Sequence, residues 1–254
     1  VKSVAVIGNG NVALDVARLL AKAPEEMTKY DIVPEAGAAI AAAPIADIHI
    51  IGRRGAEQAS FTNNELAEMG RLARAVAVAD ASVLAAQAPA SDPTPERLRK
   101  AKNIETLKRF AAQKPGEKPV TVHFRFHETP KAIRPGEIEL SSGTVAADLV
   151  VTCIGYTGEP FPQAESVFPV GWARRGPTGT IPTNRADSHA VAKQVIDFLE
   201  DRDLKSGPDI MPLCVDAEGW RRIDKAEIAA GAAQGRPRVK LVEWQSLLDM
   251  AQGD

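Results

Sequence analysis

The first twenty-two residues constrain the fold more than any other stretch of the chain. Residues 1–7 read VKSVAVI, a short run rich in β-branched residues that is typical of a buried parallel strand. Gly8-Asn9-Gly10-Asn11-Val12-Ala13 follows at once, and residues 11–22 then carry apolar side chains at helical spacing. A glycine turn between a buried strand and a helix is the GxGxxA form of the dinucleotide-binding fingerprint.

Each small residue of this turn has a physical role in such a site. Gly8 permits the tight turn, Gly10 lets the backbone approach a pyrophosphate, and Ala13 permits close packing of helix on strand. The helix N-terminus adds unpaired N–H groups and a partial positive charge. The turn therefore predicts a dinucleotide site, with a glycine turn that binds no ligand as the alternative.

The order of elements in the first 80 residues is β-α-β-α-β. This order predicts an α/β fold, a Rossmann-like parallel sheet with flanking helices. Residues 23–46, 86–95 and 155–184 contain many Pro, Gly, Ala or Ser residues and are interpreted as loops. Strands are expected at residues 1–7, 47–51, 75–79, 120–127, 131–134, 138–140 and 148–154, and helices at 11–22, 62–74, 95–113, 187–203, 216–230 and 243–251.

Composition excludes several classes of protein. A net charge of -2 gives no reason to expect a nucleic-acid partner, and no apolar run is long enough to span a membrane. The two cysteines, Cys153 and Cys214, form no CxxC pair, which argues against a dithiol centre or a cysteine zinc site. So few cysteines favour a reducing compartment, and we expect a cytoplasmic protein.

Two adjacent arginines follow the second expected strand, where the adenosine ribose of a dinucleotide would lie. NAD enzymes place Asp or Glu at this position, whereas this chain has Arg53 and Arg54. Two guanidinium groups can pair with a 2′-phosphate, which favours NADP over NAD. Two solvated surface arginines are the alternative. Glu65 also has two interpretations, as a ligand of the nucleotide or as the third helical residue of a capping box that begins at Thr62.

These residues belong to three longer motifs. The stretch from Gly8 to Arg18 resembles the NADP loop of the adrenodoxin-reductase type of ferredoxin–NADP reductase. Gly52-Arg-Arg-Gly55 and Gln58-Ala-Ser-Phe-Thr62 with Glu65-Leu66 resemble the second motif of that family. Gly171-Trp-Ala-Arg-Arg-Gly-Pro-Thr-Gly-Thr-Ile181 resembles its third. The resemblance covers most of the chain and is weakest in residues 23–46 and after about residue 205.

The resemblance implies a role for each motif. NADP and FAD are the implied cofactors, and ferredoxin or a similar iron–sulfur protein is the implied electron acceptor. The implied chemistry is hydride transfer between NADPH and FAD, for which we name no catalytic base. Asn9, Gly10, Asn11 and Val12 would hold the pyrophosphate, Arg53, Arg54 and Glu65 the adenosine end, and Gly171, Trp172, Gly179, Thr180 and Ile181 would border the FAD.

One feature departs from the family. An FAD-binding glycine fingerprint precedes the NADP loop in the family, whereas this sequence contains one fingerprint only. We therefore expect an NADP-binding domain at residues 1–154 and the C-terminal part of an FAD domain, incomplete, at residues 155–254. Trp172 is a candidate gate over the flavin. A stand-alone NADP-binding module without redox activity is the first alternative, and a flavoprotein like the small subunit of glutamate synthase is the second.

Two further patterns favour structural roles. His123 and His127 share one face of an expected strand, but a metal site needs more ligands than these two, and His49 and His189 have no obvious partners. The basic helix at residues 95–113 either docks an acidic ferredoxin or is a solvated face.

Overall fold

The computed structural model describes residues 1–87, 94–159, 161, 164–177, 179, 181–200, 202 and 214–253. The chain divides into two compact units, of which one comprises Val1–Ile154 with Val215–Asp254 and the other Gly155–Cys214. The expected domain boundary after residue 154 coincides with a boundary between units. Contacts nevertheless group residues 215–254 with the first unit, and the assignment of residues 155–254 to a flavin domain stays a prediction.

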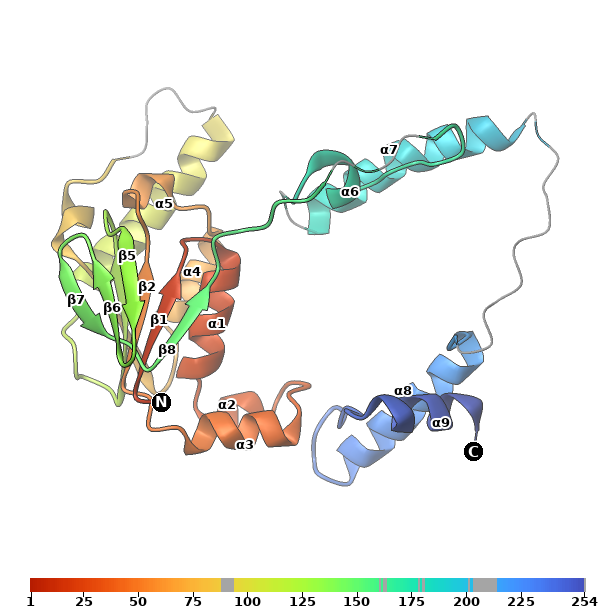
Figure 1. The fold of residues 1–254 in the computed structure, drawn as a ribbon, viewed down its shortest axis with the longest axis horizontal. Coiled ribbons are helices and arrows are strands. Elements are labelled where there is room, and N and C mark those ends of the chain that lie inside the picture. Colours follow the sequence, from red (N-terminus) through yellow and green to blue (C-terminus); the bar gives the residue numbers. More distant parts are fainter. Residues whose placement is uncertain are drawn as a thin grey trace. The chain divides into compact units, whose positions relative to one another are not determined.

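The described elements follow the predicted order (Figure 1). The strands are β1 (Ser3–Ile7), β2 (Asp47–Ile51), β3 (Ala75–Ala79), β4 (Val120–Arg125), β5 (Pro130–Arg134), β6 (Glu137–Leu140), β7 (Gly143–Ala146) and β8 (Leu149–Thr152). The helices are α1 (Asn11–Ala21), α2 (Pro24–Met27), α3 (Pro34–Ala42), α4 (Asn63–Met69), α5 (Thr94–Ala111), α6 (Trp172–Arg175), α7 (Ile181–Glu200), α8 (Ala217–Ala232) and α9 (Trp244–Gln252), with short 3-10 turns at Ala56–Gln58 and Ala81–Leu84.

The predicted parallel sheet is present in the first unit. In the described part of the chain it has five strands in the order β3-β4-β2-β1-β8, and every neighbouring pair is parallel. The connections from β1 lead to β2 on one side, and the last strand, β8, lies on the other. Ligands of open α/β sheets bind outside the carboxyl ends of the strands at such a switch point.

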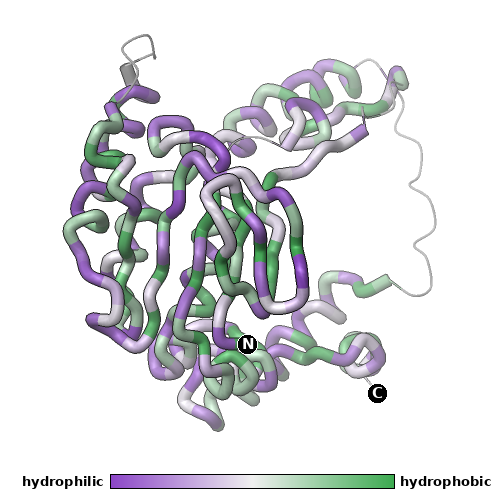
Figure 2. The backbone as a smooth tube through the Cα atoms, turned by 60° about the vertical axis from the view of Figure 1, so that its left-hand side comes forward, coloured by the Kyte–Doolittle hydropathy of each residue, from purple (hydrophilic) through white to green (hydrophobic). Residues whose placement is uncertain are grey.

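The two faces of this sheet have different covers. Helices α1, α4 and α5 pack on one face, where Leu14, Leu66 and Leu107 are buried with Ile48 and Phe124 of the strands. A second sheet, which is antiparallel and has the strand order β5-β6-β7, covers part of the other face (Figure 1). Figure 2 shows hydrophobic residues along the central strands, whereas α5 is largely hydrophilic.

Two stretches expected to be loops contain helices. In the insert at residues 23–46, Pro24 and Pro34 each stand at the beginning of a helix, α2 and α3. Proline is favoured there because its missing N–H would be unpaired anyway, so these prolines mark helix starts. In residues 155–184, α6 is one short helix, and α7 begins at Ile181.

Smaller differences concern element boundaries. Helix α4 ends at Met69 before Gly70, so it is shorter than the predicted residues 62–74. Strand β7 is absent from the prediction because Gly143–Ala146 has few apolar residues and pairs only with β6. His127 lies beyond the end of β4 with a positive φ of 57°, so it does not share a strand face with His123.

The last forty described residues form a helical hairpin that contacts the insert. Glu227 of α8 is buried and pairs with Arg238 and Lys240 at 3.3 and 3.0 Å. Arg236 donates to the carbonyl of Tyr30, and Arg238 lies 3.4 Å from the Asp31 carboxylate. No helix in the described part of the chain is long and apolar enough to cross a membrane.

Candidate nucleotide-binding site

The turn after β1 lies against the end of β8. Gly8 has a φ of 137°, and a Cβ at this position would stand 2.2 Å from the carbonyl oxygen of Cys153. The Cys153 N–H in turn donates to the Ile7 carbonyl at 2.7 Å. Both the backbone conformation and the close approach require glycine, as the fingerprint predicts. Burial raises the pKa of the Cys153 thiol, so this cysteine stays protonated at neutral pH.

Helix α1 begins without a side-chain cap. Gly10 occupies the N-cap position in an extended conformation, and it offers no side chain to bond the first N–H groups. The first-turn donors of such a helix need an external acceptor, such as a phosphate oxygen. Val12 in the first turn is 49% exposed, so this end of the helix is open to a ligand.

Asn9 is the unusual side chain of the loop. Its amide lies directly over Gly52, where a Cβ would stand 1.7 Å from Asn9 Nδ2. Asn9 Oδ1 is buried and has no hydrogen-bond partner among the described residues. A buried acceptor without a partner is costly in an empty site, so this oxygen is available to a donor group of a ligand.

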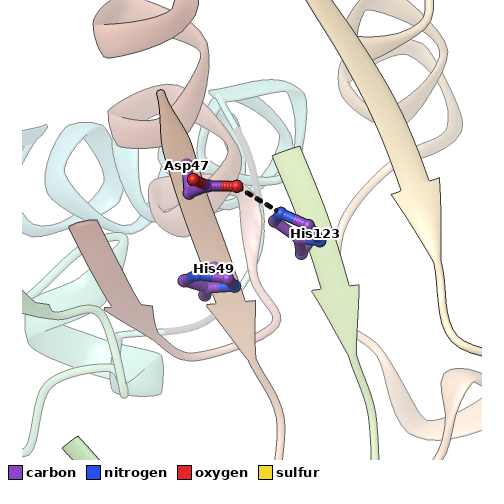
Figure 3. A group of neighbouring side chains, drawn as sticks. All are labelled: Asp47, His49 and His123. Carbon is purple, nitrogen blue, oxygen red and sulfur yellow. Dashed lines mark hydrogen bonds and ion pairs between the residues drawn. The ribbon is translucent and has the colours of Figure 1, made fainter. Parts of the chain in front are cut away.

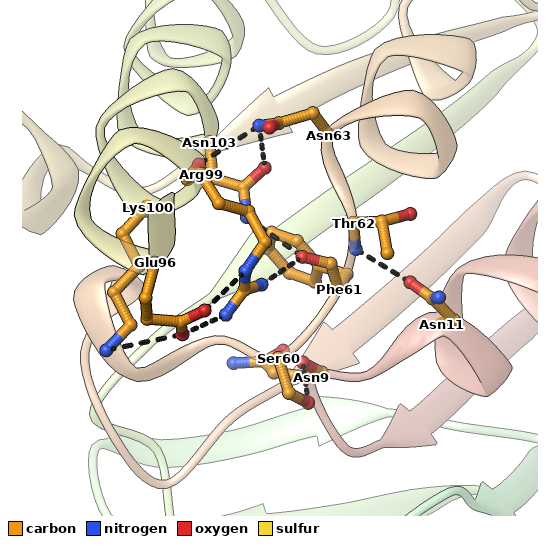
Figure 4. A network of polar contacts seen from close by, with 10 residues as sticks. All are labelled: Asn9, Asn11, Ser60, Phe61, Thr62, Asn63, Glu96, Arg99, Lys100 and Asn103. Carbon is orange, nitrogen blue, oxygen red and sulfur yellow. Dashed lines mark hydrogen bonds and ion pairs between the residues drawn. The ribbon is translucent and has the colours of Figure 1, made fainter. Parts of the chain in front are cut away.

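Residues 60–62 form the wall opposite the turn (Figure 4). The Ser60 N–H donates to the Asn9 carbonyl at 2.8 Å, and the Thr62 N–H donates to Asn11 Oδ1 at 2.8 Å. The side chain of Asn11 is therefore used to bind this wall, which leaves its backbone N–H for a phosphate. The predicted capping box is wrong, because Thr62 is the N-cap residue of α4 but its side chain makes no cap hydrogen bond.

Two residues of α5 hold this wall from behind, and sequence reasoning missed both. Arg99 Nη1 and Asn103 Nδ2 each donate to the Phe61 carbonyl at 2.9 Å (Figure 4). Asn103 is 1% exposed and accepts from Asn63 at 2.6 Å. An uninterrupted polar helix gives no sequence signal for which residues turn inward, although a buried Asn needs partners of this kind.

The two arginines after β2 are free to bind an anion. Arg53 and Arg54 are exposed, and no ion pair in the described part of the chain involves either of them. Their backbone is fixed, because Gly52 donates to the Arg125 carbonyl at 2.9 Å and the Arg54 carbonyl accepts from His127 at 3.2 Å. Two unpaired guanidinium groups on a rigid turn suit a phosphate monoester.

Glu65 already has a charged partner. Its carboxylate lies 2.8 Å from Arg18 Nη1, and Arg18 also pairs with Glu68 and Asp15. The side chain of Glu65 is 31% exposed, so one face remains open. Its role beside the nucleotide stays a prediction.

The third motif lies in the second unit. Gly171 has a φ of 62°, and its N–H donates to the buried Asp187 carboxylate at 2.6 Å. Trp172 is 49% exposed, and its ring centroid is 6.3 Å from that of Tyr156. Gly179 has a φ of 91° and Ile181 is 85% exposed. Thr180 lies outside the described residues. An exposed Trp and Ile on one short stretch are consistent with an apolar ring as partner.

Comparisons with known proteins identify relatives of this chain. No family model matches it. NADPH-ferredoxin reductase FprA of Mycobacterium tuberculosis is 33% identical over 306 residues, which cover 98% of this chain and 67% of that protein. The chain belongs to the NADPH-ferredoxin reductase family. It spans about two thirds of the length of this relative.

Two further comparisons point to the same family. The mitochondrial NADPH:adrenodoxin oxidoreductase of Bos taurus is 29% identical over 310 residues. The solved structure of Mycobacterium tuberculosis FprA in complex with NADPH has a TM-score of 0.83 and 32% identity, covering 99% of this chain and 68% of that one. The family is therefore the predicted one, and its fold is the predicted α/β fold. The names of these relatives describe oxidoreductases that act with NADPH and with ferredoxin or adrenodoxin.

The matched stretch is shorter here than in the relatives. The match to FprA extends over 306 residues, whereas this chain has 254 in total, so at least 52 aligned positions have no residue in this chain.

Proposed function

We propose that this chain is the NADP(H)-binding part of a flavin-dependent ferredoxin–NADP reductase. The observation that carries the proposal is the combination of an uncapped α1 N-terminus, the unpartnered Asn9 Oδ1 and two unpaired arginines at the adjacent strand end. Together they offer backbone N–H groups to a pyrophosphate and guanidinium groups to a 2′-phosphate. The residues present therefore fit NADP.

In this proposal the first unit binds and orients the dinucleotide. The backbone N–H groups of Asn11 and Val12, with Gly10 allowing close approach, bind the pyrophosphate. Arg53 and Arg54 bind the 2′-phosphate and so distinguish NADP from NAD. Asn9 Oδ1 accepts from a donor of the bound nucleotide. FAD, when bound, supplies the hydride acceptor and the single-electron steps that an iron–sulfur partner needs.

The segment from Gly171 to Ile181 would border the FAD. Asp187 fixes the turn at Gly171, and Trp172 presents an exposed ring that would stack where the nicotinamide must later lie. No proton needs to be held for hydride transfer itself, and we assign no catalytic base.

Ferredoxin or a similar iron–sulfur protein is the acceptor in this proposal. Helix α5 presents Arg97, Lys102 and Arg109 to solvent, which suits an acidic partner. Arg99, in contrast, is turned inward to Phe61. We propose a cytoplasmic location, because two unpaired cysteines suit a reducing compartment.

The test is a titration of the chain with NADPH and NADH while the visible spectrum is recorded. The proposal expects NADPH to bind at least tenfold more tightly than NADH. Similar affinity for both would contradict the arginine assignment. A flavin spectrum that changes on addition of NADPH supports the reductase, whereas NADPH binding without FAD uptake, even after FAD is added, favours the stand-alone binding module.

A further inference from the structure

Two neighbouring strands place three potential metal ligands together on the sheet face opposite α1 (Figure 3). Asp47 and His49 lie two residues apart on β2, so their side chains point to the same face. His123 of β4 is the register partner of His49. The flanking register positions hold Ala5 on β1 and Val78 on β3.

The geometry of these side chains is close to that of a coordination site. The rings of His49 and His123 stack with centroids 4.5 Å apart and planes 23° apart. His123 Nε2 lies 2.8 Å from Asp47 Oδ1. One nitrogen of each ring and one carboxylate oxygen all lie within 4.8 Å of one another. Tetrahedral zinc with bonds near 2.1 Å separates its ligand atoms by about 3.4 Å, so small side-chain rotations would bring them into place.

Burial favours the uncharged form of both imidazole rings. Burial, together with the nearby His123 and Arg125, lowers the pKa of His49 to about 4. Burial also lowers the pKa of His123, against the opposing effect of its bond to Asp47. Two neutral imidazoles and one carboxylate are a ligand set that zinc and similar divalent ions prefer.

We propose that Asp47, His49 and His123 form a binding site for a divalent transition metal ion, Zn²⁺ foremost. The ion would take the place of the proton that now bridges His123 and Asp47, and water would complete the coordination. The side chain of Asp47 is 45% exposed, so the ion can enter from solvent although His49 is buried.

The guanidinium group of Arg125 should weaken metal binding at this site, and this effect can be tested. Its Nε donates to His49 Nδ1 at 3.3 Å. If a metal binds His49 Nε2, the ring proton must be on Nδ1, and this contact with the guanidinium is lost. Coulomb repulsion between Arg125 and the ion acts in the same direction. Removal of this charge should therefore tighten metal binding.

The site lies apart from the nucleotide loop. Asp47 is the first residue of β2, whereas the phosphate turn and Arg53 follow the opposite, carboxyl ends of the strands. Metal binding and NADPH binding can thus be measured independently, and failure of one proposal does not affect the other.

The experiment is a calorimetric titration of the metal-free chain with Zn²⁺, with visible absorption of the Co²⁺ form as a second readout. We expect one saturable equivalent, d–d bands typical of a tetrahedral ion, and a rise in Tm. The double variant His49→Val/His123→Val should bind at least 100-fold more weakly, Asp47→Asn about tenfold more weakly, and Arg125→Gln several-fold more tightly.

Controls separate this site from adventitious binding. His189→Gln and Cys214→Ser remove exposed potential ligands elsewhere in the chain. Each variant should still bind one Zn²⁺ per chain with unchanged affinity. The double valine variant should keep the far-ultraviolet circular dichroism spectrum of the parent chain, which shows that it is folded. The proposal is overturned if the chain does not bind one Zn²⁺ at saturation, or if the double valine variant binds Zn²⁺ with equal affinity.

Discussion

The amide of Asn9 lies on the bare Cα of Gly52, where a Cβ would stand 1.7 Å from Asn9 Nδ2. The contact joins the turn after β1 to the turn after β2, and it brings the proposed pyrophosphate loop and the arginine pair to one edge of the sheet. We expect Gly52→Ala to displace the Asn9 side chain while the fold persists, because an amide end can rotate away. NADPH affinity, measured by fluorescence titration, should fall at least tenfold. An unchanged affinity would show that Asn9 has no part in binding.

The exposed arginines should determine the preference for NADPH. Because each charge-assisted hydrogen bond is worth roughly 1.5–3 kcal/mol, Arg53→Ala/Arg54→Ala should weaken NADPH binding about 100-fold or more. NADH binding should change little. Arg221→Ala, which removes an exposed arginine of α8, is the matched control. Equal losses for both nucleotides would point to general electrostatics and against recognition of the 2′-phosphate.

Asn103 should matter more for stability than its polar helix suggests. Asn103→Ala leaves Asn63 with one partner fewer and removes one of two donors to the Phe61 carbonyl. The loss of a buried hydrogen-bonding group costs about 1–3 kcal/mol. Urea unfolding monitored by circular dichroism measures this difference, with Lys102→Ala at the exposed neighbouring position as control. A variant as stable as the parent chain would exclude Asn103 as an anchor of the wall.

Asp187 should hold the third motif. Its carboxylate accepts the Gly171 N–H and lies 3.0 Å from Arg174 Nη2. Asp187→Asn keeps the shape and removes the charge, so the turn before Trp172 should open more often. Amide hydrogen exchange of Gly171 and its neighbours should speed up several-fold, while exchange in β1 stays the same. Protection equal to that of the unchanged chain would contradict this role.

His49 should make the fold sensitive to acid. Its pKa is lowered to about 4 from the ordinary 6.5, so between these values the unfolded chain binds a proton that the folded chain does not. Stability is therefore highest above about pH 6.5 and falls as the pH decreases toward 4, by at most about 1.4 kcal/mol per pH unit. His49→Val should flatten this part of the unfolding free energy against pH. Parallel curves for the two chains would show that His49 does not carry the effect.

Sequence reasoning found those parts of the fold that local chemistry determines. The turn at Gly8 has a signature of its own. The buried strands β2 and β3 were predicted to the residue, because each is a short β-rich run that ends at a glycine or a polar residue. The prolines of the insert were misleading, because the same residue begins a helix or interrupts one, depending on where the chain packs.

The parts that remained hidden depend on contacts distant in sequence. His49 stacks on His123, 74 residues away on β4, which lies between β2 and β3 in the sheet. No local sequence pattern predicts this order of strands. Arg99 and Asn103 likewise bond to Phe61 about 40 residues earlier. The Thr62–Glu65 pattern had the spacing of a capping box, but the Glu65 side chain instead forms an ion pair with Arg18 of another helix.

The contact of Gly8 with Cys153 has a mechanical consequence. Cys153 stands two residues before Gly155, where the second unit begins. The tightest turn of the nucleotide loop therefore touches the strand from which the chain leaves the first unit. A side chain at position 8 would meet the Cys153 carbonyl, two residues before the second unit begins. Substitution of Gly8 would therefore disturb two parts of the backbone at once, the glycine turn before α1 and the segment that leads out of the first unit.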